Sequence, residues 1–197
     1  MDQTVPFGGG AYFICLALLV FGRGMDILST RVATPNLILE GNPIAKKLGW
    51  TGNIILSVAI CCVFGLWPLP AIVITTTSVL IAARNFQNAW LMRSMGEEAY
   101  RAWHVARLME APLSLFLFCL AGQSVLPAMV GAALIMYGGT YTAFGIGVGT
   151  VCYATAVAFY TLLAVWRIRR APRYLEFHEP GETAKGESKD DHVLTHS

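Results

Sequence analysis

Charged side chains are scarce in this 197-residue sequence, and three long stretches have none. Only 13% of the residues are Asp, Glu, Lys or Arg, whereas a typical soluble domain has about 25%. The uncharged stretches are residues 3–22, 53–83 and 111–166. Each is long enough for a helix to cross the hydrocarbon core of a bilayer, which takes about 20 residues. This scarcity excludes an ordinary soluble domain and predicts a multi-pass helical membrane protein.

Several signatures of known chemistry are also missing. The sequence contains no P-loop, GxSxG, HExxH or GxGxxG motif, and nothing in it predicts nucleic-acid binding. Its five cysteines lie in apolar runs without CxxC spacing, so we expect them to be packing residues rather than disulfides or metal ligands. The first apolar run has no basic segment before it and no A-x-A-like site after it, which predicts an uncleaved span.

The number of spans has two interpretations. We expect spans at about residues 10–33, 53–67 and 71–92, followed by a mixed-charge segment that forms an amphipathic helix at the membrane interface. In this segment Glu97 is spaced i,i+4 from Arg101. Residues 112–166 hold two spans if the chain turns only near residues 137–142, and three shorter ones if it turns instead at "GQS" (122–124) and again near "FGIGVG" (144–149). The first choice gives five spans in total and the second gives six.

The distribution of basic residues favours five spans. They cluster in three places: Arg31, Lys46 and Lys47; Arg93, Arg101 and Arg107; and Arg167, Arg169, Arg170 and Arg173. With five spans and the N-terminus outside, all three clusters face the cytoplasm, as the positive-inside rule requires. We therefore predict an all-α bundle of five spans in residues 1–170. The polar segment 171–197 is expected to be a disordered cytoplasmic tail.

Two charged residues interrupt the first span. Asp26 lies three positions after Arg23, so the two side chains are able to neutralise one another on one helix face. Alternatively, Asp26 belongs to a functional site, because Ser29 and Thr30 add hydroxyl groups to nearly the same face. The sequence leaves both interpretations open.

The third span carries a second polar group near its end, made of Arg84, Asn85 and Asn88. Arg84 lies nine residues before Arg93, about 13 Å along a helix, which is too far for its side chain to reach the interface easily. A guanidinium at this depth needs an anion. We therefore expect Arg84 to pair with Asp26.

Four further residues have both a structural and a functional interpretation. Asn42 before Pro43 is a typical helix N-cap, and Glu40 is either a solvated loop carboxylate or part of a site. His104 and Arg107 lie on one face of the amphipathic segment, where His104 is either a proton donor or simply an amphipathic residue.

The segments "DILST" (26–30) and "LEGNP" (39–43) resemble a D-x-x-[ST]-T … E-x-N-P signature. This signature is characteristic of an uncharacterised family of small prokaryotic multi-pass membrane proteins. The resemblance covers residues 22–92. It implies that Asp26, Thr30, Glu40 and Asn42 form a site, and it implies no particular activity.

The five-span topology brings the polar residues to the cytoplasmic boundary, and we expect a site there. Its predicted catalytic residues are Asp26, Glu40 and His104; its predicted substrate-binding residues are Thr30, Asn42, Arg84, Asn85, Asn88 and Arg107. Asp26 and Glu40 are also candidate ligands for a divalent cation such as Mg²⁺ or Ca²⁺, which prefer oxygen donors.

The best functional hypothesis is an intramembrane enzyme that acts on a lipid head group or another anionic amphipathic substrate. The alternatives are a non-catalytic membrane subunit or assembly factor, and a transporter of a small solute or ion with a glycine-rich hinge in its last span. Expected partners are the bilayer, an anionic lipid and a second copy of the chain, in the inner (cytoplasmic) membrane.

Overall fold

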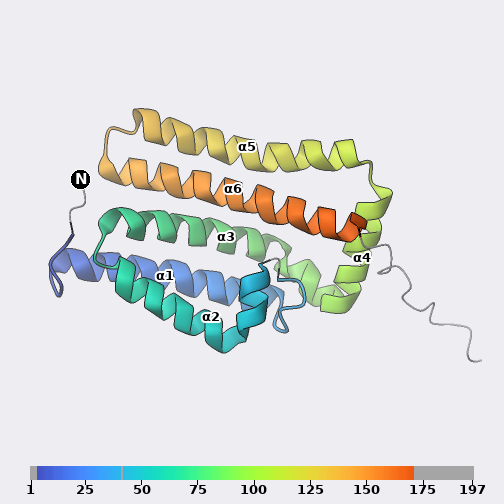
Figure 1. Ribbon diagram of the computed structural model, residues 1–197, viewed down its shortest axis with the longest axis horizontal. Helices are drawn as coiled ribbons and strands as arrows, with labels where there is room; N and C mark the ends of the chain where they lie inside the picture. Colours follow the sequence, from blue (N-terminus) through green and yellow to red (C-terminus); the bar gives the residue numbers. More distant parts are fainter. Residues whose placement is uncertain (1–3, 41, 171–197) are drawn as a thin grey trace, which may run out of the picture.

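Six helices make up the computed structural model, which describes residues 4–40 and 42–170 (Figure 1). They are α1 (Gly10–Ala33), α2 (Pro43–Phe64), α3 (Pro68–Met95), α4 (Glu97–Glu110), α5 (Leu113–Tyr137) and α6 (Tyr141–Arg170). All except α4 are long and apolar enough to cross a membrane. The chain is therefore an integral, multi-pass membrane protein, and the predicted all-α bundle with five spans is confirmed. The segment expected to form a polar tail, 171–197, lies outside the described residues.

The alternative with six spans was wrong, because both segments that suggested extra turns are helical. Helix α5 is a single helix of 25 residues that contains Pro127, and α6 continues through Gly145 and Gly149 over 30 residues. The turn between them lies at residues 138–140, where Gly139 has a positive φ of 61°. Glycine adopts such a backbone conformation at no steric cost. The predicted amphipathic helix is α4.

The second and third spans begin earlier than predicted, because Pro43 and Pro68 each start a helix. The short helix that begins at Pro43 continues into the span, with one break at Gly49, where φ is 66° and ψ is −170°. The span ends at Phe64. Pro68 then begins α3, since a proline in the first turn loses no helical hydrogen bond.

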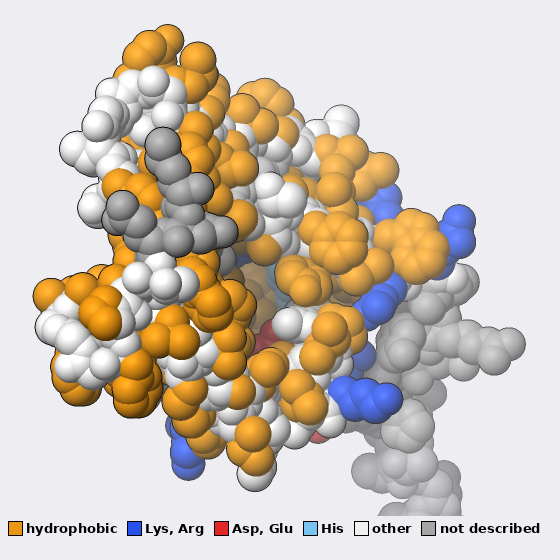
Figure 2. All heavy atoms as spheres, turned by 60° about the vertical axis from the view of Figure 1, so that its left-hand side comes forward, with side chains coloured by type: hydrophobic (Ala, Val, Ile, Leu, Met, Phe, Trp, Pro, Cys, Tyr) orange, Lys and Arg blue, Asp and Glu red, His pale blue; other side chains and the backbone are white. Residues whose placement is uncertain are grey.

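The spans form an open row rather than a closed bundle. Helix α1 packs mainly on α3, α3 also packs on α6, and α6 packs on α5, while α2 packs on α1 and, less extensively, on α3 (Figure 1). Helices α1 and α5 are thus separated by two other helices. Figure 2 shows hydrophobic side chains over most of one face of this row, with a hollow in which a few acidic atoms are visible.

Close packing between the helices depends on glycines. A Cβ atom at Gly131 of α5 would lie 2.7 Å from the carbonyl oxygen of Gly147 in α6, and one at Gly147 would lie 2.6 Å from that of Gly131. Gly145 and Gly149 leave similar space for Ile72 and Thr76 of α3. The glycines of α6 therefore allow close helix packing, whereas the transporter hypothesis interpreted them as a hinge.

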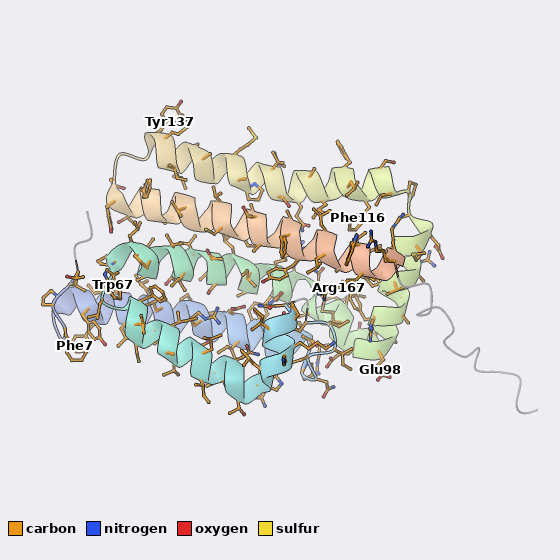
Figure 3. The ribbon with its side chains drawn as sticks, in the orientation of Figure 1. Phe7, Trp67, Glu98, Phe116, Tyr137 and Arg167 are labelled. Atoms are coloured by element: carbon orange, nitrogen blue, oxygen red, sulfur yellow. The ribbon has the colours of Figure 1, made fainter. Side chains whose placement is uncertain are left out.

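The helix termini lie at two opposite edges of the molecule (Figure 1), and these two ends differ in composition. One end contains the α1–α2 connector, α4 and the end of α6, and Figure 3 shows Glu98 and Arg167 there. Phe7, Trp67 and Tyr137 lie at the other end. The short loops at that second end, residues 4–9, 65–67 and 138–140, contain no Lys or Arg. We call the first the basic end and the second the aromatic end.

Candidate functional site

Arg23 and Asp26 form an ion pair inside α1, with 2.8 Å between Nη1 of Arg23 and Oδ2 of Asp26. Arg23 also donates hydrogen bonds to Ser57 of α2 at 3.0 Å and to Ser78 of α3 at 3.4 Å. Its Nε is buried and has no hydrogen-bond partner. Of the two interpretations of Asp26, the structure therefore contains the ion pair with Arg23. The pair also joins three helices.

This ion pair lies deep in the span. Arg23 lies thirteen residues after Gly10 and ten residues before Ala33. At 1.5 Å per residue these separations are about 20 Å and 15 Å. The side chain thus starts close to the middle of the helix, where a charge is costly unless it is paired. Arg23 and the two serines were not singled out as one site, because the three helices are distant in sequence.

Asn85 connects α3 to the two hydroxyl groups that follow Asp26. Its Nδ2 donates hydrogen bonds of 3.2 Å to both Ser29 and Thr30. The buried Ser29 hydroxyl in turn donates to the backbone carbonyl of Asp26 at 2.9 Å. Together with the Arg23 cluster, these contacts form a polar seam along the α1–α3 interface. Thr30 and Asn85, both predicted site residues, are brought together by it.

The predicted pair between Arg84 and Asp26 was wrong. The ion-pair partner of Asp26 is Arg23, which lies on the same helix and needs no tertiary alignment. Asn85, the next residue after Arg84, is the one that faces α1. Asn88 is exposed, and Arg84 is only partly buried. The structure therefore brings neither Arg84 nor Asn88 into the polar seam.

Glu40 and Asn42 shape the connector between α1 and α2. The Glu40 carboxylate accepts a 2.8 Å hydrogen bond from the backbone N–H of Asn42, and the Asn42 side chain accepts one of 3.0 Å from the N–H of Ile44. Asn42 is therefore an N-cap. Neither hydrogen bond of this turn involves Asp26. The two acidic residues of the signature thus have separate partners, Asn42 for Glu40 and Arg23 for Asp26.

A buried carboxylate, Glu97, holds the other side of this connector. It accepts four hydrogen bonds: from the Thr34 hydroxyl at 2.7 Å, from the backbone and side chain of Asn36 at 2.9 and 3.1 Å, and from the N–H of Ile38 at 3.2 Å. Burial raises the pKa of Glu97, but these hydrogen bonds outweigh it and leave the pKa below its ordinary value. Glu97 therefore fastens the start of α4 to the connector.

Sequence reasoning missed the partners of Glu97, because they precede it by about sixty positions. The sequence does contain a signal for the start of α4. Gly96 has a φ of 82°, a value that favours glycine, and two glutamates follow it in the first turn of α4. The sequence predicts from this only that a helix begins, and not that its first glutamate is buried.

His104 and Arg107 lie on α4 outside the polar seam. The exposed His104 ring stacks on Tyr100, with ring centroids 5.9 Å apart. Arg107 forms a 2.8 Å ion pair with Glu110, and both side chains are 59% exposed. Both residues therefore have partners on α4 itself, as expected for an amphipathic helix, and neither contacts Asp26.

An open groove of about 530 Å³ lies at the basic end, between the connector and the corner where α3 meets α4. Pro35, Asn36, Ile38, Met92, Arg93, Met95, Gly96, Glu97, Glu98 and Ala99 line it. Arg93 and Glu98 are both exposed, whereas Glu97 is buried. The groove therefore combines apolar side chains with one accessible positive and one accessible negative charge.

No family model, curated protein or solved structure matches this chain. Within residues 4–40 and 42–170 there is also no cluster of three or more His, Cys, Asp or Glu side chains able to hold a metal ion. Asp26 and Glu40 are the two carboxylates that the sequence suggested as metal ligands. Binding of Mg²⁺ or Ca²⁺ by them stays a prediction.

Proposed function

We propose that this protein binds the head group of a phospholipid, or of a similar phosphate-bearing amphipathic molecule, in the groove at its basic end. The observation that carries the proposal is the combination of Arg93 with apolar side chains at the end of the third span. Arginine holds phosphate oxygens through directed N–H donors. The neighbouring apolar residues, such as Met92 and Ile38, suit the first part of an acyl chain.

The second charge in the groove, on Glu98, restricts which type of head group fits there. Glu98 is exposed beside the buried Glu97 and is able to receive a cation. A zwitterionic head group with phosphate and ammonium, such as phosphoethanolamine, satisfies Arg93 and Glu98 together. A purely anionic head group satisfies Arg93 but meets repulsion from Glu98. We therefore favour a zwitterionic head group over the anionic one expected from the sequence.

This proposal is one of binding. None of the predicted catalytic residues Asp26, Glu40 and His104 lines the groove. An enzyme acting on the bound head group needs a reacting group there, and Glu98 is the exposed carboxylate available to it.

The test is native mass spectrometry of the protein released from nanodiscs that contain equal amounts of phosphatidylethanolamine and phosphatidylglycerol. The wild type is expected to retain phosphatidylethanolamine. Arg93→Gln is expected to lose both lipids, and Glu98→Gln to shift the preference toward phosphatidylglycerol. Arg107→Gln, which removes an exposed arginine outside the groove, is the matched control. Unchanged lipid retention in Arg93→Gln would overturn the proposal.

We also propose that the basic end faces the cytoplasm, which places both the N-terminal end of α1 and the α5–α6 turn outside. The support is the absence of Lys and Arg from the described loops of the aromatic end, together with the basic residues at the other. A membrane-impermeant maleimide applied to intact cells is expected to label Thr140→Cys and not Ser94→Cys, in a chain whose native cysteines are replaced by alanine. The reverse pattern would contradict this orientation.

The Arg23–Asp26 pair favours a second candidate, a carrier for protons or small cations. A charge near the middle of a span is typical of transport pathways. Proton uptake by proteoliposomes under a pH gradient tests it: transport is expected with the wild type and not with Asp26→Asn. Equal fluxes in both would eliminate this candidate.

A further inference from the structure

A polar side chain on α5 faces outward near the middle of the helix. Gln123 lies ten residues after Leu113 and fourteen before Tyr137. These separations correspond to about 15 Å and 21 Å along the helix, so the side chain is too deep to reach water at either end. Gln123 is exposed and makes no hydrogen bond to any other described residue. In a bilayer its amide group would be left in hydrocarbon, which is costly.

Pro127 leaves the backbone carbonyl of Gln123 without its usual hydrogen-bond donor. In a regular helix the N–H of residue 127 would donate to the backbone carbonyl of residue 123, but proline has no N–H. Helix α5 contains Pro127 in its interior, so the carbonyl of Gln123 lacks its usual donor. The side chain and the backbone of Gln123 therefore both need an external hydrogen-bond partner at this depth.

The residues around Gln123 form a regular exposed seam. It is made of Cys119, Gln123, Leu126, Val130, Ala133 and Tyr137, all exposed. Their spacing alternates between four and three residues, which is the pattern of a helix that packs along a left-handed coiled coil. A different face of α5, centred about 120° around the helix from the seam at about 100° per residue, buries Leu120, Ser124 and Gly131, and Figure 3 shows Tyr137 pointing away from α6. The seam is thus free on the outermost helix of the row.

We infer that α5 is the contact helix of a homodimer in which the Gln123 residues of two copies hydrogen-bond to each other across a two-fold axis. A second copy is the partner because a primary amide has both N–H donors and a carbonyl acceptor. Two identical glutamines related by a two-fold axis therefore satisfy each other, and each N–H₂ group is also able to donate to the freed backbone carbonyl of the other copy. Polar residues at such positions fix the register of packed helices.

The chain supplies its own probes for this interface. Cys119 lies in the seam, whereas Cys62 is exposed on α2 at the opposite end of the row. We would prepare one variant that keeps only Cys119 and another that keeps only Cys62, with the other cysteines replaced by alanine. A short bis-maleimide added to native membranes is expected to give a cross-linked dimer with the first variant and not with the second.

The role of Gln123 is tested by Gln123→Leu in the variant that keeps only Cys119. A membrane-embedded hydrogen bond contributes enough that its loss should weaken association about three- to tenfold. Gln123→Asn, which retains the amide, should weaken it less. Leucine is well tolerated in lipid, and the melting temperature in detergent would show whether the monomer is intact.

Three results would overturn the inference. The first is a wild-type chain that forms no dimer in membranes, and the second is a dimer fraction that Gln123→Leu leaves unchanged. The third is cross-linking of Cys119 to a different protein in place of a second copy, which would assign the seam to another partner.

Discussion

The hydroxyl of Thr34 donates a 2.7 Å hydrogen bond to the buried carboxylate of Glu97, sixty-three positions later in the sequence. This contact joins the end of the first span to the start of α4. The same carboxylate accepts three more hydrogen bonds from Asn36 and Ile38. The groove borders this contact, so its shape depends on Glu97.

Glu97→Ala is expected to lower the thermal stability of the detergent-solubilised protein and to disorder the groove. The substitution leaves up to four donors without their acceptor, and a hydrogen bond to a charged group contributes about 1.5–3 kcal/mol. The neighbouring Glu98→Ala is the control, because that side chain is exposed. The check is the melting temperature of each variant, and equal values in all three proteins would refute a fastening role for Glu97.

The same carboxylate predicts a pH dependence. Its pKa in the folded protein is below its ordinary value of 4.5. A depressed pKa contributes stability that is fully present above the unfolded pKa and is lost as the pH falls through the folded value. The wild type should therefore lose stability below about pH 4.5, and the stability difference between it and Glu97→Gln should shrink as the pH falls. Melting temperatures of both proteins between pH 3 and pH 7, about the range in which a carboxyl titrates, test this. A difference independent of pH would contradict it.

The Arg23–Asp26 pair should behave as a coupled unit. Asp26→Leu leaves the Arg23 charge unpaired near mid-membrane, so it is expected to destabilise the protein by up to about 3 kcal/mol. The double variant Arg23→Leu/Asp26→Leu removes both charges and should recover much of that loss. Unfolding in mixed detergent provides the measurement. Strictly additive effects of the two substitutions would show that the pair contributes no coupling energy.

The close contact of α5 with α6 should not tolerate a methyl group. Gly147→Ala places Cβ 2.6 Å from the carbonyl oxygen of Gly131, so the helices must separate. We expect a loss of about 1–3 kcal/mol, which is typical of overpacking. Gly24→Ala on α1 is the control, because nothing lies within 4 Å of that Cβ position. There alanine should be neutral or slightly stabilising, since it favours helix. The contact would be refuted if Gly147→Ala melted like the control.

The sequence by itself determined the membrane class, the count of spans and the amphipathic helix. Long uncharged stretches and segregated basic residues report local transfer energies, and those depend on neighbouring residues in the chain. It also determined the N-cap at Asn42 and the possible pairing of Arg23 with Asp26, because both involve partners within three positions.

Only the tertiary structure decided which helices meet and which polar residues share a partner. The serines that receive hydrogen bonds from Arg23, the choice of Asn85 rather than Arg84 to face α1, and the donors around Glu97 all depend on contacts between distant segments. No local pattern encodes the rotation of one helix against another. That rotation is set by packing such as the contact between Gly131 and Gly147, where two helix backbones approach because both side chains are missing.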